Sequence, residues 1–228
     1  MSYAMLKRFS CAIALAAASS LVSAAPLVSG FDVGDEGWLV DSSQGTQGVT
    51  DFVWNAAGGN PGGHLSARDI GDQGGWWFLS PLTWGGDWSA YLGGTIRFDV
   101  FSIAGQSEVM NPPVEAVVLV LEDGGRLRAG FGAGAVLDQW ISVEVPLVAE
   151  SFNLTNSSYA SFDEALGHVV RLVIPGDFVY RQNDITRLDN VQVRAVPAPG
   201  TLPLLVAALL GCVAIRAPRR QCRSRRLR

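Results

Sequence analysis

The stretch VVLVLEDGGRLR, residues 117–128, decides the fold class of this chain. Residues 117–121 are all apolar and mostly β-branched, which is typical of a strand covered on both faces. Residues 123–125 (DGG) form turns readily, and residues 126–128 (RLR) resume with alternating polar and apolar side chains. The stretch therefore predicts a β-hairpin whose first strand lies in the centre of a sheet.

Alternating polar and apolar residues predict further strands on both sides of this hairpin. In residues 95–100 (TIRFDV), Ile96 and Phe98 fall on the buried face, and residues 140–145 (WISVEV) repeat the pattern. The region 31–193 is rich in Gly, is broken by Pro, Asn and Asp, and lacks apolar periodicity of helix length. Further strands are expected at residues 37–41, 51–55, 64–68, 75–80, 168–174 and 188–194.

One short helix is expected among these strands. Residues 161–164 (SFDE) match a capping box, in which a Ser side chain and the Glu three residues later cap the first helical turn. About nine or ten short strands around one helical turn predict an all-β domain, specifically a jelly-roll-like sandwich of two sheets.

The N-terminal end has the pattern of a cleaved export signal. Residues 1–8 end in a basic pair, residues 9–18 are apolar, and residues 22–24 (VSA) have the small side chains that signal peptidase accepts. We therefore expect a signal peptide over residues 1–24, cut after Ala24. This expectation makes the Sec translocon and signal peptidase partners of the chain.

The C-terminal end, residues 196–228, has three parts. A Pro-containing motif comes first, then an apolar segment over residues 202–215, and then seven arginines within the last 13 residues. A 14-residue helix is about 21 Å long, against roughly 30 Å of hydrocarbon, so the segment predicts a short transmembrane helix suited to transient retention. The arginines are expected to stay on the cytoplasmic side. The motif residues are Val196, Pro197, Ala198, Pro199 and Gly200.

This three-part end resembles the PEP-CTERM sorting signal of bacterial exported proteins. The family motif usually has Glu at the position of Ala198, so this chain departs from it at one residue. The resemblance implies cutting at the Pro motif by an exosortase-type membrane protease. It also implies transfer towards the cell surface and exopolysaccharide, with a simple tail anchor as the alternative.

Charge is distributed unevenly along the chain. All 21 acidic residues lie between Asp32 and Asp189. Two of the 17 basic residues lie near the N-terminus and seven in the last 13 residues, so eight remain in the middle of the chain, whose net charge is 8 − 21 = −13. Phosphate contacts need a basic face, which argues against nucleic acid as a partner. The same negative net charge argues against any polyanionic partner.

The middle of the chain, residues 25–195, resembles the laminin B domain, also called laminin domain IV. In animals this domain is an extracellular-matrix module, a β-sandwich similar to carbohydrate-binding modules and without a catalytic role. The resemblance therefore implies a sandwich fold and an extracellular setting. It rests on the motifs FD at 31–32, EGW at 36–38, GHLSA at 63–67 with Asp69, WWFLSP at 76–81, GDW at 86–88, YLGGTIRFD at 91–99, Trp140 before VPL at 145–147, and LDNV at 188–191.

Catalytic motifs are absent from the sequence. His64 and His168 are the only histidines, and no H-E-x-x-H, C-x-x-C, Walker or G-x-S-x-G pattern occurs. Carboxylate pairs for glycoside hydrolysis stay open, since their separation across a fold is invisible in sequence. We therefore expect no enzymatic activity.

Calcium is the metal that the resemblance implies. In similar jelly-roll modules an acid near the first strand and one in the last strand share a structural calcium ion, and Asp32 and Asp189 occupy those positions, with Asp69 as a possible third ligand. The alternative interpretation is that these aspartates cap turns. No EF-hand ligand spacing is present.

Seven tryptophans raise the possibility of sugar binding, because an exposed indole face can stack on a pyranose ring. In the predicted strand 76–78 the side chain of Trp77 points away from those of its neighbours. Trp84 and Trp88 lie in a Gly-rich loop, where aromatic side chains are more available to a ligand. These three are the candidate ligand-binding residues.

The sequence thus predicts an exported, non-enzymatic cell-surface module for adhesion or association with the exopolysaccharide matrix. A dedicated carbohydrate-binding protein is the alternative, and a glycan hydrolase or lyase on the same sandwich is the third.

Overall fold

The hairpin predicted at residues 117–128 forms as expected. In the computed structural model, β7 (Glu115–Leu121) pairs antiparallel with β8 (Arg126–Gly130). The amide of Leu121 donates to the carbonyl of Gly125 at 2.9 Å, and Gly124 has a φ of 83°, which glycine adopts without a Cβ clash. The structure describes residues 24–43, 49–70, 75–103, 115–131, 138–178 and 185–196, and all of these belong to one compact unit.

The first sheet, called sheet B, contains this hairpin. Its strands follow the order β10-β8-β7-β11-β5-β2, so β7 is central, as predicted. Every neighbouring pair is antiparallel. The other strands are β2 (Leu39–Ser42), β5 (Trp76–Leu79), β10 (Phe152–Thr155) and β11 (Val169–Pro175).

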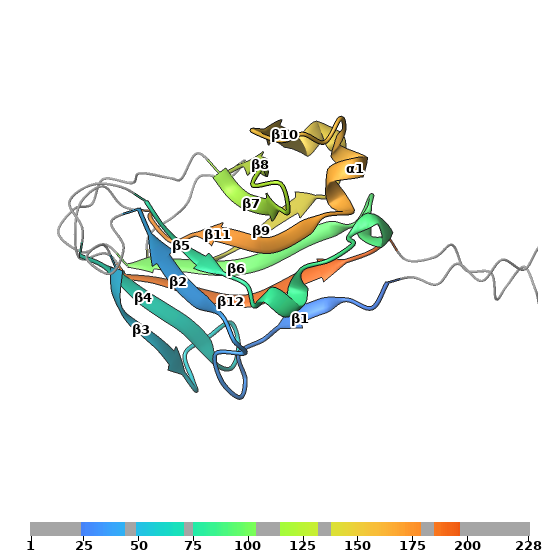
Figure 1. The fold of residues 1–228 in the computed structure, drawn as a ribbon. Coiled ribbons are helices and arrows are strands. Elements are labelled where there is room, and N and C mark those ends of the chain that lie inside the picture. The colour runs from blue at the N-terminus through green and yellow to red at the C-terminus, as the bar shows by residue number, and fades with distance from the viewer. Residues whose placement is uncertain are drawn as a thin grey trace, which may run out of the picture. The chain divides into compact units, whose positions relative to one another are not determined.

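The second sheet, called sheet A, has the order β3-β4-β12-β6-β9, with β1 paired to the end of β12. It is also antiparallel throughout, and Figure 1 shows its strands forming a layer behind those of sheet B. Its strands are β1 (Leu27–Ser29), β3 (Val49–Asn55), β4 (His64–Asp69), β6 (Thr95–Ile103), β9 (Trp140–Pro146) and β12 (Ile185–Arg194).

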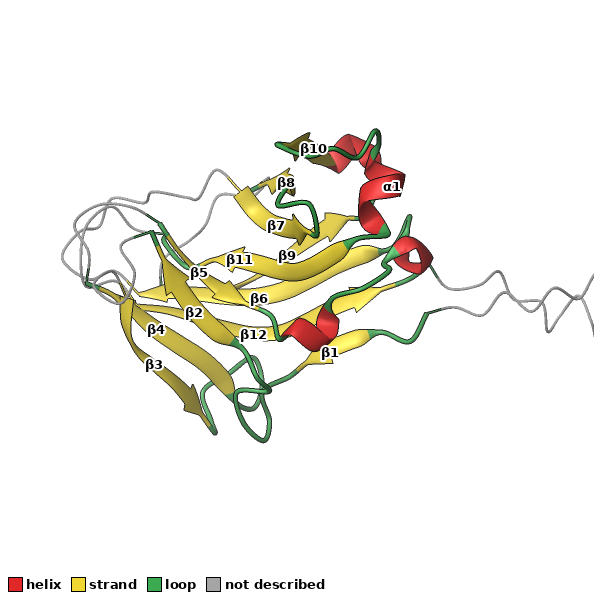
Figure 2. Ribbon diagram, viewed as in Figure 1, coloured by secondary structure: helices red, strands yellow, loops and turns green. Residues whose placement is uncertain are grey.

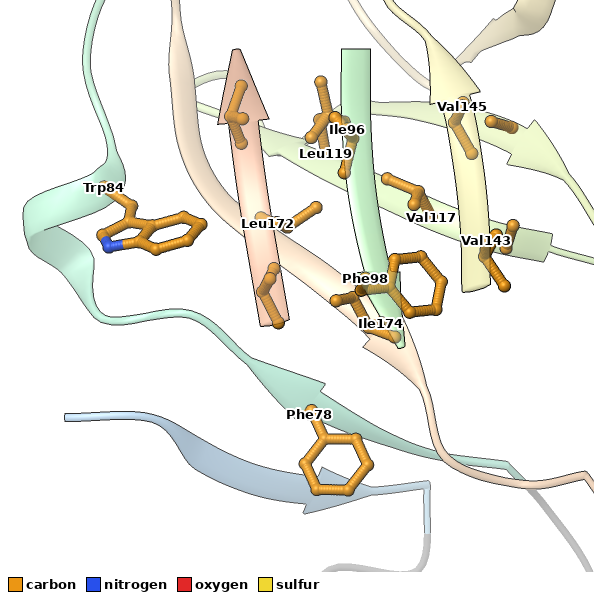
Figure 3. Packing of buried hydrophobic residues seen from close by; sticks show 14 of the residues in the cluster. Phe78, Trp84, Ile96, Phe98, Val117, Leu119, Val143, Val145, Leu172 and Ile174 are labelled. Atoms are coloured by element: carbon orange, nitrogen blue, oxygen red, sulfur yellow. The ribbon is translucent and has the colours of Figure 1, made fainter. Parts of the chain in front are cut away.

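The core lies between the two sheets. Ile96 and Phe98 of β6 are fully buried, as their alternation predicts, and they face Leu119 and Leu172 of sheet B (Figure 3). Burying such side chains is the main term that stabilises a sandwich, at about 25 cal/mol per Å² of apolar surface. The expected all-β sandwich of two antiparallel sheets is therefore confirmed.

The predicted helix also forms. Helix α1 (Phe162–Leu166) begins after Ser161, whose Oγ accepts a hydrogen bond from the amide of Glu164 at 3.2 Å. The Glu164 carboxylate accepts from the amide of Ala160 at 2.8 Å, one residue earlier than in the standard capping box. Figure 2 shows α1 next to β10 at one end of sheet B. Two strands, β1 and β10, were not predicted, because three or four residues are too few to show alternation.

The end segments lie outside the described residues. This applies to the signal peptide up to residue 23, to motif residues 197–200, to the apolar segment 202–215 and to the arginine-rich tail. Within the described ranges, no helix is long and apolar enough to cross a membrane. Val196, the first motif residue, is described and is 52% exposed.

Candidate functional site

The outward face of sheet B carries a shallow hollow. Alternation along β5 buries Trp76 and Phe78 in the core and turns Trp77 and Leu79 outward. The hollow measures about 200 Å³, below the roughly 300–1,000 Å³ of pockets that enclose a ligand, so it suits an extended chain lying across the sheet. Its lining residues are Asp41, Trp77, Leu79, Glu115, Val118, Val120, Arg126, Arg128 and Val173.

Strand pairing decides which side chains meet in this hollow. Trp77 is the direct partner of Asp41 on β2 and of Pro175 on β11. One pair further along the strands, Leu79 lies opposite Val173, which in turn lies opposite Val118. The floor is thus apolar, while carboxylates and guanidinium groups stand around it. Apolar rings with a few polar groups are the usual composition of a sugar-binding cleft.

Gly75 sets the position of the Trp77 indole. A Cβ on Gly75 would lie 3.2 Å from the Trp77 Cζ2 atom and 3.7 Å from two further ring atoms. The Trp77 ring therefore lies against the main chain at Gly75, which has no side chain. This packing restricts the rotation of an otherwise half-buried indole.

An ion pair spans the opposite side of the hollow. A guanidinium nitrogen of Arg128 on β8 contacts a carboxylate oxygen of Glu115 on β7, and the two side chains are 30% and 25% exposed. The pair holds the Arg128 side chain against the sheet. Arg126, two residues before Arg128, points to the same face because strand side chains repeat every second residue.

The expected exposure of the other two candidate tryptophans is wrong. Trp84 is 8% and Trp88 is 2% exposed, because their Gly-rich loop folds into two 3-10 turns, η2 (Leu82–Trp84) and η3 (Ser89–Tyr91), that pack on the core. The Trp84 ring makes an edge contact with Trp38 at 5.5 Å between centroids. The Trp88 indole N–H donates to the Trp84 carbonyl at 2.7 Å. Of the three candidates, the structure leaves only Trp77 beside a surface hollow.

A second aromatic surface, which sequence reasoning missed, lies on the outward face of sheet A. The rings of Phe101 on β6 and Trp140 on β9 meet edge to face at 5.6 Å, and the Arg187 guanidinium stands 5.1 Å from the Phe101 ring centre. The outward position of Phe101 and Trp140 could be read from alternation. Their meeting depends on the pairing of β6 with β9.

Asp32 and Asp189 lie close together, as the sequence comparison with jelly-roll modules implies. Both approach the Gly-rich loop 58–63. A Cβ on Gly59 would lie 2.6 Å from an Asp189 carboxylate oxygen, and a Cβ on Gly62 would lie 2.4 Å from one of Asp32. The main-chain oxygens of Gly62 and Gly63 lie beside Gly59, and that of Phe31 lies beside Gly63.

A third acid, Asp99, lies beside this pair and was missed. Asp99 and Asp189 are direct partners on β6 and β12, and both are almost completely buried. The Asn190 side-chain amide donates to Asp99 at 2.8 Å and that of Asn60 at 3.2 Å. The amides of Asn60 and Asn190 donate to Asp189. The sequence alone could not show that Asp99 and Asp189 are partners, because their pairing depends on the register between β6 and β12.

Burial raises the pKa of Asp189 to about 6, and the negative charges of Asp99 and Asp32 add to the rise, while the two backbone hydrogen bonds oppose it. Asp69 is not among the charges that act on Asp189; its charge instead acts on Asp177, which follows β11. Burial, helped by Asp69, raises the pKa of Asp177 to about 7. Among the described residues no three acids, histidines or cysteines gather to hold a metal ion, so calcium here would need main-chain oxygens as well.

The two histidines lie in different surroundings. His64 begins β4 in sheet A and is 4% exposed, and burial, with the charge of Arg187, lowers its pKa. His168 stacks on Tyr159 at 4.5 Å and contacts Glu122 at 2.9 Å near sheet B. Neither histidine is placed next to a candidate nucleophile in the contacts of the described residues.

Comparison with known proteins finds likeness in the fold alone. No family model matches the sequence, and no curated protein matches it. The structure is similar to the L4b domain of human laminin alpha-2, with a TM-score of 0.53 and 9% identity over 76% of this chain and 98% of that one. It is also similar to a family 11 carbohydrate-binding module from Clostridium thermocellum, solved in complex with a β-1,3-1,4-mixed-linked tetrasaccharide. That match has a TM-score of 0.52 and 15% identity over 76% of this chain and 98% of that one.

These two similarities show that the laminin-like resemblance of the sequence holds at the level of the fold. The chain has the β-sandwich shared by a laminin domain and a carbohydrate-binding module. At sequence identities of 9% and 15%, the likeness shows the fold and does not carry over ligands or site residues.

Proposed function

We propose that this chain is an exported, non-enzymatic surface module that attaches to a polysaccharide chain through the outward face of sheet B. The observation that carries the proposal is the Trp77 indole, which lies over Gly75 at the edge of an apolar hollow. Asp41 and the charged residues of β7 and β8 stand around the hollow as hydrogen-bonding groups for sugar hydroxyls.

The fold similarity supports this proposal without deciding it. One similar structure is a carbohydrate-binding module with a tetrasaccharide, and the other is a domain of a laminin. Binding to a polysaccharide matrix is compatible with both the leading expectation from sequence, matrix association, and its alternative, carbohydrate binding. In either case the module contributes recognition and no bond-breaking step.

The direct test is binding of the full-length protein to a glycan array, followed by titration calorimetry on the best ligand. Trp77→Ala should weaken binding by about tenfold or more, because aromatic anchors of this kind are worth at least about 1.4 kcal/mol. Trp140→Ala on the outward face of sheet A is the matched control and should leave the affinity unchanged. A loss only in Trp140→Ala would move the site to sheet A, and equal losses in both variants would contradict binding through sheet B alone.

An assay for reducing ends separates this proposal from the third expectation, a hydrolase or lyase. Glycans that the protein binds should show no new reducing ends after long incubation. Release of such ends, abolished by a single carboxylate substitution, would show that the protein is an enzyme.

The export route remains part of the proposal. The expected first residue of the mature chain, Ala25, accepts a hydrogen bond from the Tyr91 hydroxyl on its carbonyl, and β1 then pairs with β12 so that Leu27 lies opposite Val193. This arrangement fixes both ends of the domain side by side. Mass spectrometry of the exported protein should show chains that begin near Ala25 and end within residues 196–200. Recovery of Arg228 in the surface-exposed protein would overturn cutting by an exosortase-type protease.

A further inference from the structure

Sheet B carries three arginines in a domain that is acidic overall. The region between Asp32 and Asp189 contains 21 acidic residues, and the basic residues of the same domain are eight arginines. Three of those eight, Arg126, Arg128 and Arg171, belong to β8 and β11 of sheet B, the two strands that flank β7. The average charge of the domain conceals these three positive charges on sheet B.

The strand register places these arginines on the outward face. Arg126 lies opposite Val120, and Val120 lies opposite Arg171, so the two arginines stand on either side of one valine of the hollow. Two strand spacings separate them, which is about 10 Å between their main chains. Arg128 lies on the same face, opposite Val118.

Two of the three guanidinium groups form no ion pair with a described residue. Arg128 pairs with Glu115, whereas Arg126 and Arg171 form no ion pair within the part of the chain that the structure describes. Acids outnumber arginines more than twofold in this domain, so acidic partners are plentiful. Two unpaired arginines beside an apolar hollow and an aromatic ring therefore favour recognition of a negative charge from outside.

We infer that the polysaccharide bound by this face is acidic, with carboxylate groups of uronate sugars held by Arg126 and Arg171. The inference rests on the proposed function and names its ligand class. Guanidinium groups bind carboxylates through two parallel hydrogen bonds, which a neutral sugar hydroxyl cannot reproduce. The apolar floor and Trp77 hold the sugar ring, and the arginines select the charged substituent.

The overall charge of the domain does not oppose this arrangement at physiological salt. The Debye length is about 8 Å at 0.15 M, so acids elsewhere on the surface are largely screened from a ligand on sheet B. Among the residues lining the hollow, Asp41 and Glu115 are the acids, and Glu115 is neutralised by Arg128. The expectation from sequence that polyanionic partners are excluded rests on the net charge of the whole domain. That net charge does not describe the charges around this hollow.

The test compares polyuronates with their own carboxyl-reduced forms. The full-length protein is titrated with polygalacturonate, with alginate and with the neutral polymers made from each by reduction of the carboxyl groups. We expect at least about tenfold weaker binding of the reduced polymer, because charge-assisted hydrogen bonds are lost. Binding of the native polymer should also weaken as salt is raised.

Variants assign the effect to the two arginines. The double variant Arg126→Gln with Arg171→Gln should lose about tenfold or more in affinity for the native polymer and should bind the reduced polymer as before. Arg97→Gln is the matched control, because Arg97 lies on sheet A, where its side chain contacts Ser142. Circular dichroism and thermal melting verify that each variant is folded.

Three outcomes would overturn the inference. Equal binding of native and reduced polymers, or binding only of neutral glycans on the array, would reject an acidic ligand and leave the proposed function standing. Equal competition by a single-stranded polynucleotide would show attraction to any polyanion instead of recognition of uronate. Failure to bind any glycan, native or neutral, would reject the proposed function together with the inference.

Discussion

Trp77 and Asp41 are direct cross-strand partners on β5 and β2, and both line the hollow on the outward face of sheet B. A ring face and a carboxylate that stand side by side can contact one sugar simultaneously, the ring by stacking and the carboxylate by accepting hydrogen bonds from hydroxyl groups. The pairing exists because β2 joins the edge of sheet B next to β5.

Asp41→Asn should weaken glycan binding by about three- to tenfold, since a charge-assisted hydrogen bond becomes a neutral one. Asp41 is exposed, and among the described residues its carboxylate accepts a hydrogen bond only from the neighbouring Ser42 amide, so folding should be unaffected. Titration calorimetry measures the change, and Asp163→Asn on the exposed surface of α1 serves as the control. An unchanged affinity would remove Asp41 from the site.

Gly75→Ala should displace the Trp77 ring, because the new methyl group would lie 3.2 Å from Cζ2. The contact is tighter than normal van der Waals packing but involves a side chain that can turn. We therefore expect weaker glycan binding with little change in melting temperature. The control is Ala90→Gly, which changes an exposed residue of the turn η3. Gly86→Ala would not serve, because Gly86 has a φ of 125°, which an alanine rarely adopts. Tryptophan fluorescence should report the altered position of the ring.

Asp177→Asn should stabilise the protein at pH 8. The pKa of Asp177 is raised to about 7, and one of its carboxylate oxygens is buried without a hydrogen-bond partner among the described residues. A raised carboxyl pKa means that the folded state binds the proton more tightly than the unfolded state, so stability falls as pH rises from about 4 to 7. Replacing the charge by an amide should recover on the order of 1–2 kcal/mol at pH 8, after allowance for solvent screening.

The gain corresponds to a melting temperature higher by about 2–8 °C for a domain of this size. Thermal melts of the wild type and the variant between pH 4 and pH 8 provide the measurement. The two curves should converge near pH 4, where the wild-type carboxyl is protonated. A variant that is equally destabilised at every pH would show that the carboxylate makes a favourable contact instead.

Calcium should raise the melting temperature of the protein by binding at the carboxylates of Asp32 and Asp189. Like charges directly opposite on adjacent strands destabilise a sheet, and Asp99 and Asp189 are both buried in that arrangement. A cation bound only by the folded state would add about 2.7 kcal/mol at a hundredfold excess over Kd, or roughly 5–10 °C. The main-chain oxygens of Gly62 and Gly63 beside Gly59 would complete the oxygen ligands.

Differential scanning calorimetry in chelator and in millimolar calcium tests this expectation. Asp189→Ala should abolish the difference, whereas Asp69→Ala should retain it, because Asp69 acts on Asp177 and not on Asp189. In chelator the raised pKa of Asp189 should make the protein less stable as pH rises from about 4 to 6. Identical melting temperatures in chelator and calcium would assign these aspartates to turn and loop structure alone.

Local sequence pattern was sufficient for the elements and for the direction of many side chains. The hairpin at residues 117–128, the inward Ile96 and Phe98, and the cap at Ser161 all follow from interactions within a few residues. Alternation alone also separated Trp77 from Trp76, because the two-residue period is a property of the extended backbone. The two-sheet sandwich followed from many such strands in one domain.

Tertiary structure decided which of those side chains meet. Trp84 and Trp88 are buried because their loop packs on the core, although their local sequence is typical of an exposed loop. Asp189 meets Asp99 instead of Asp69, and Arg126 and Arg171 share a face although 45 positions separate them in the sequence. These contacts depend on strand order and register between distant segments, which are set by packing of the whole core. A pattern that extends over a few residues contains no information about them.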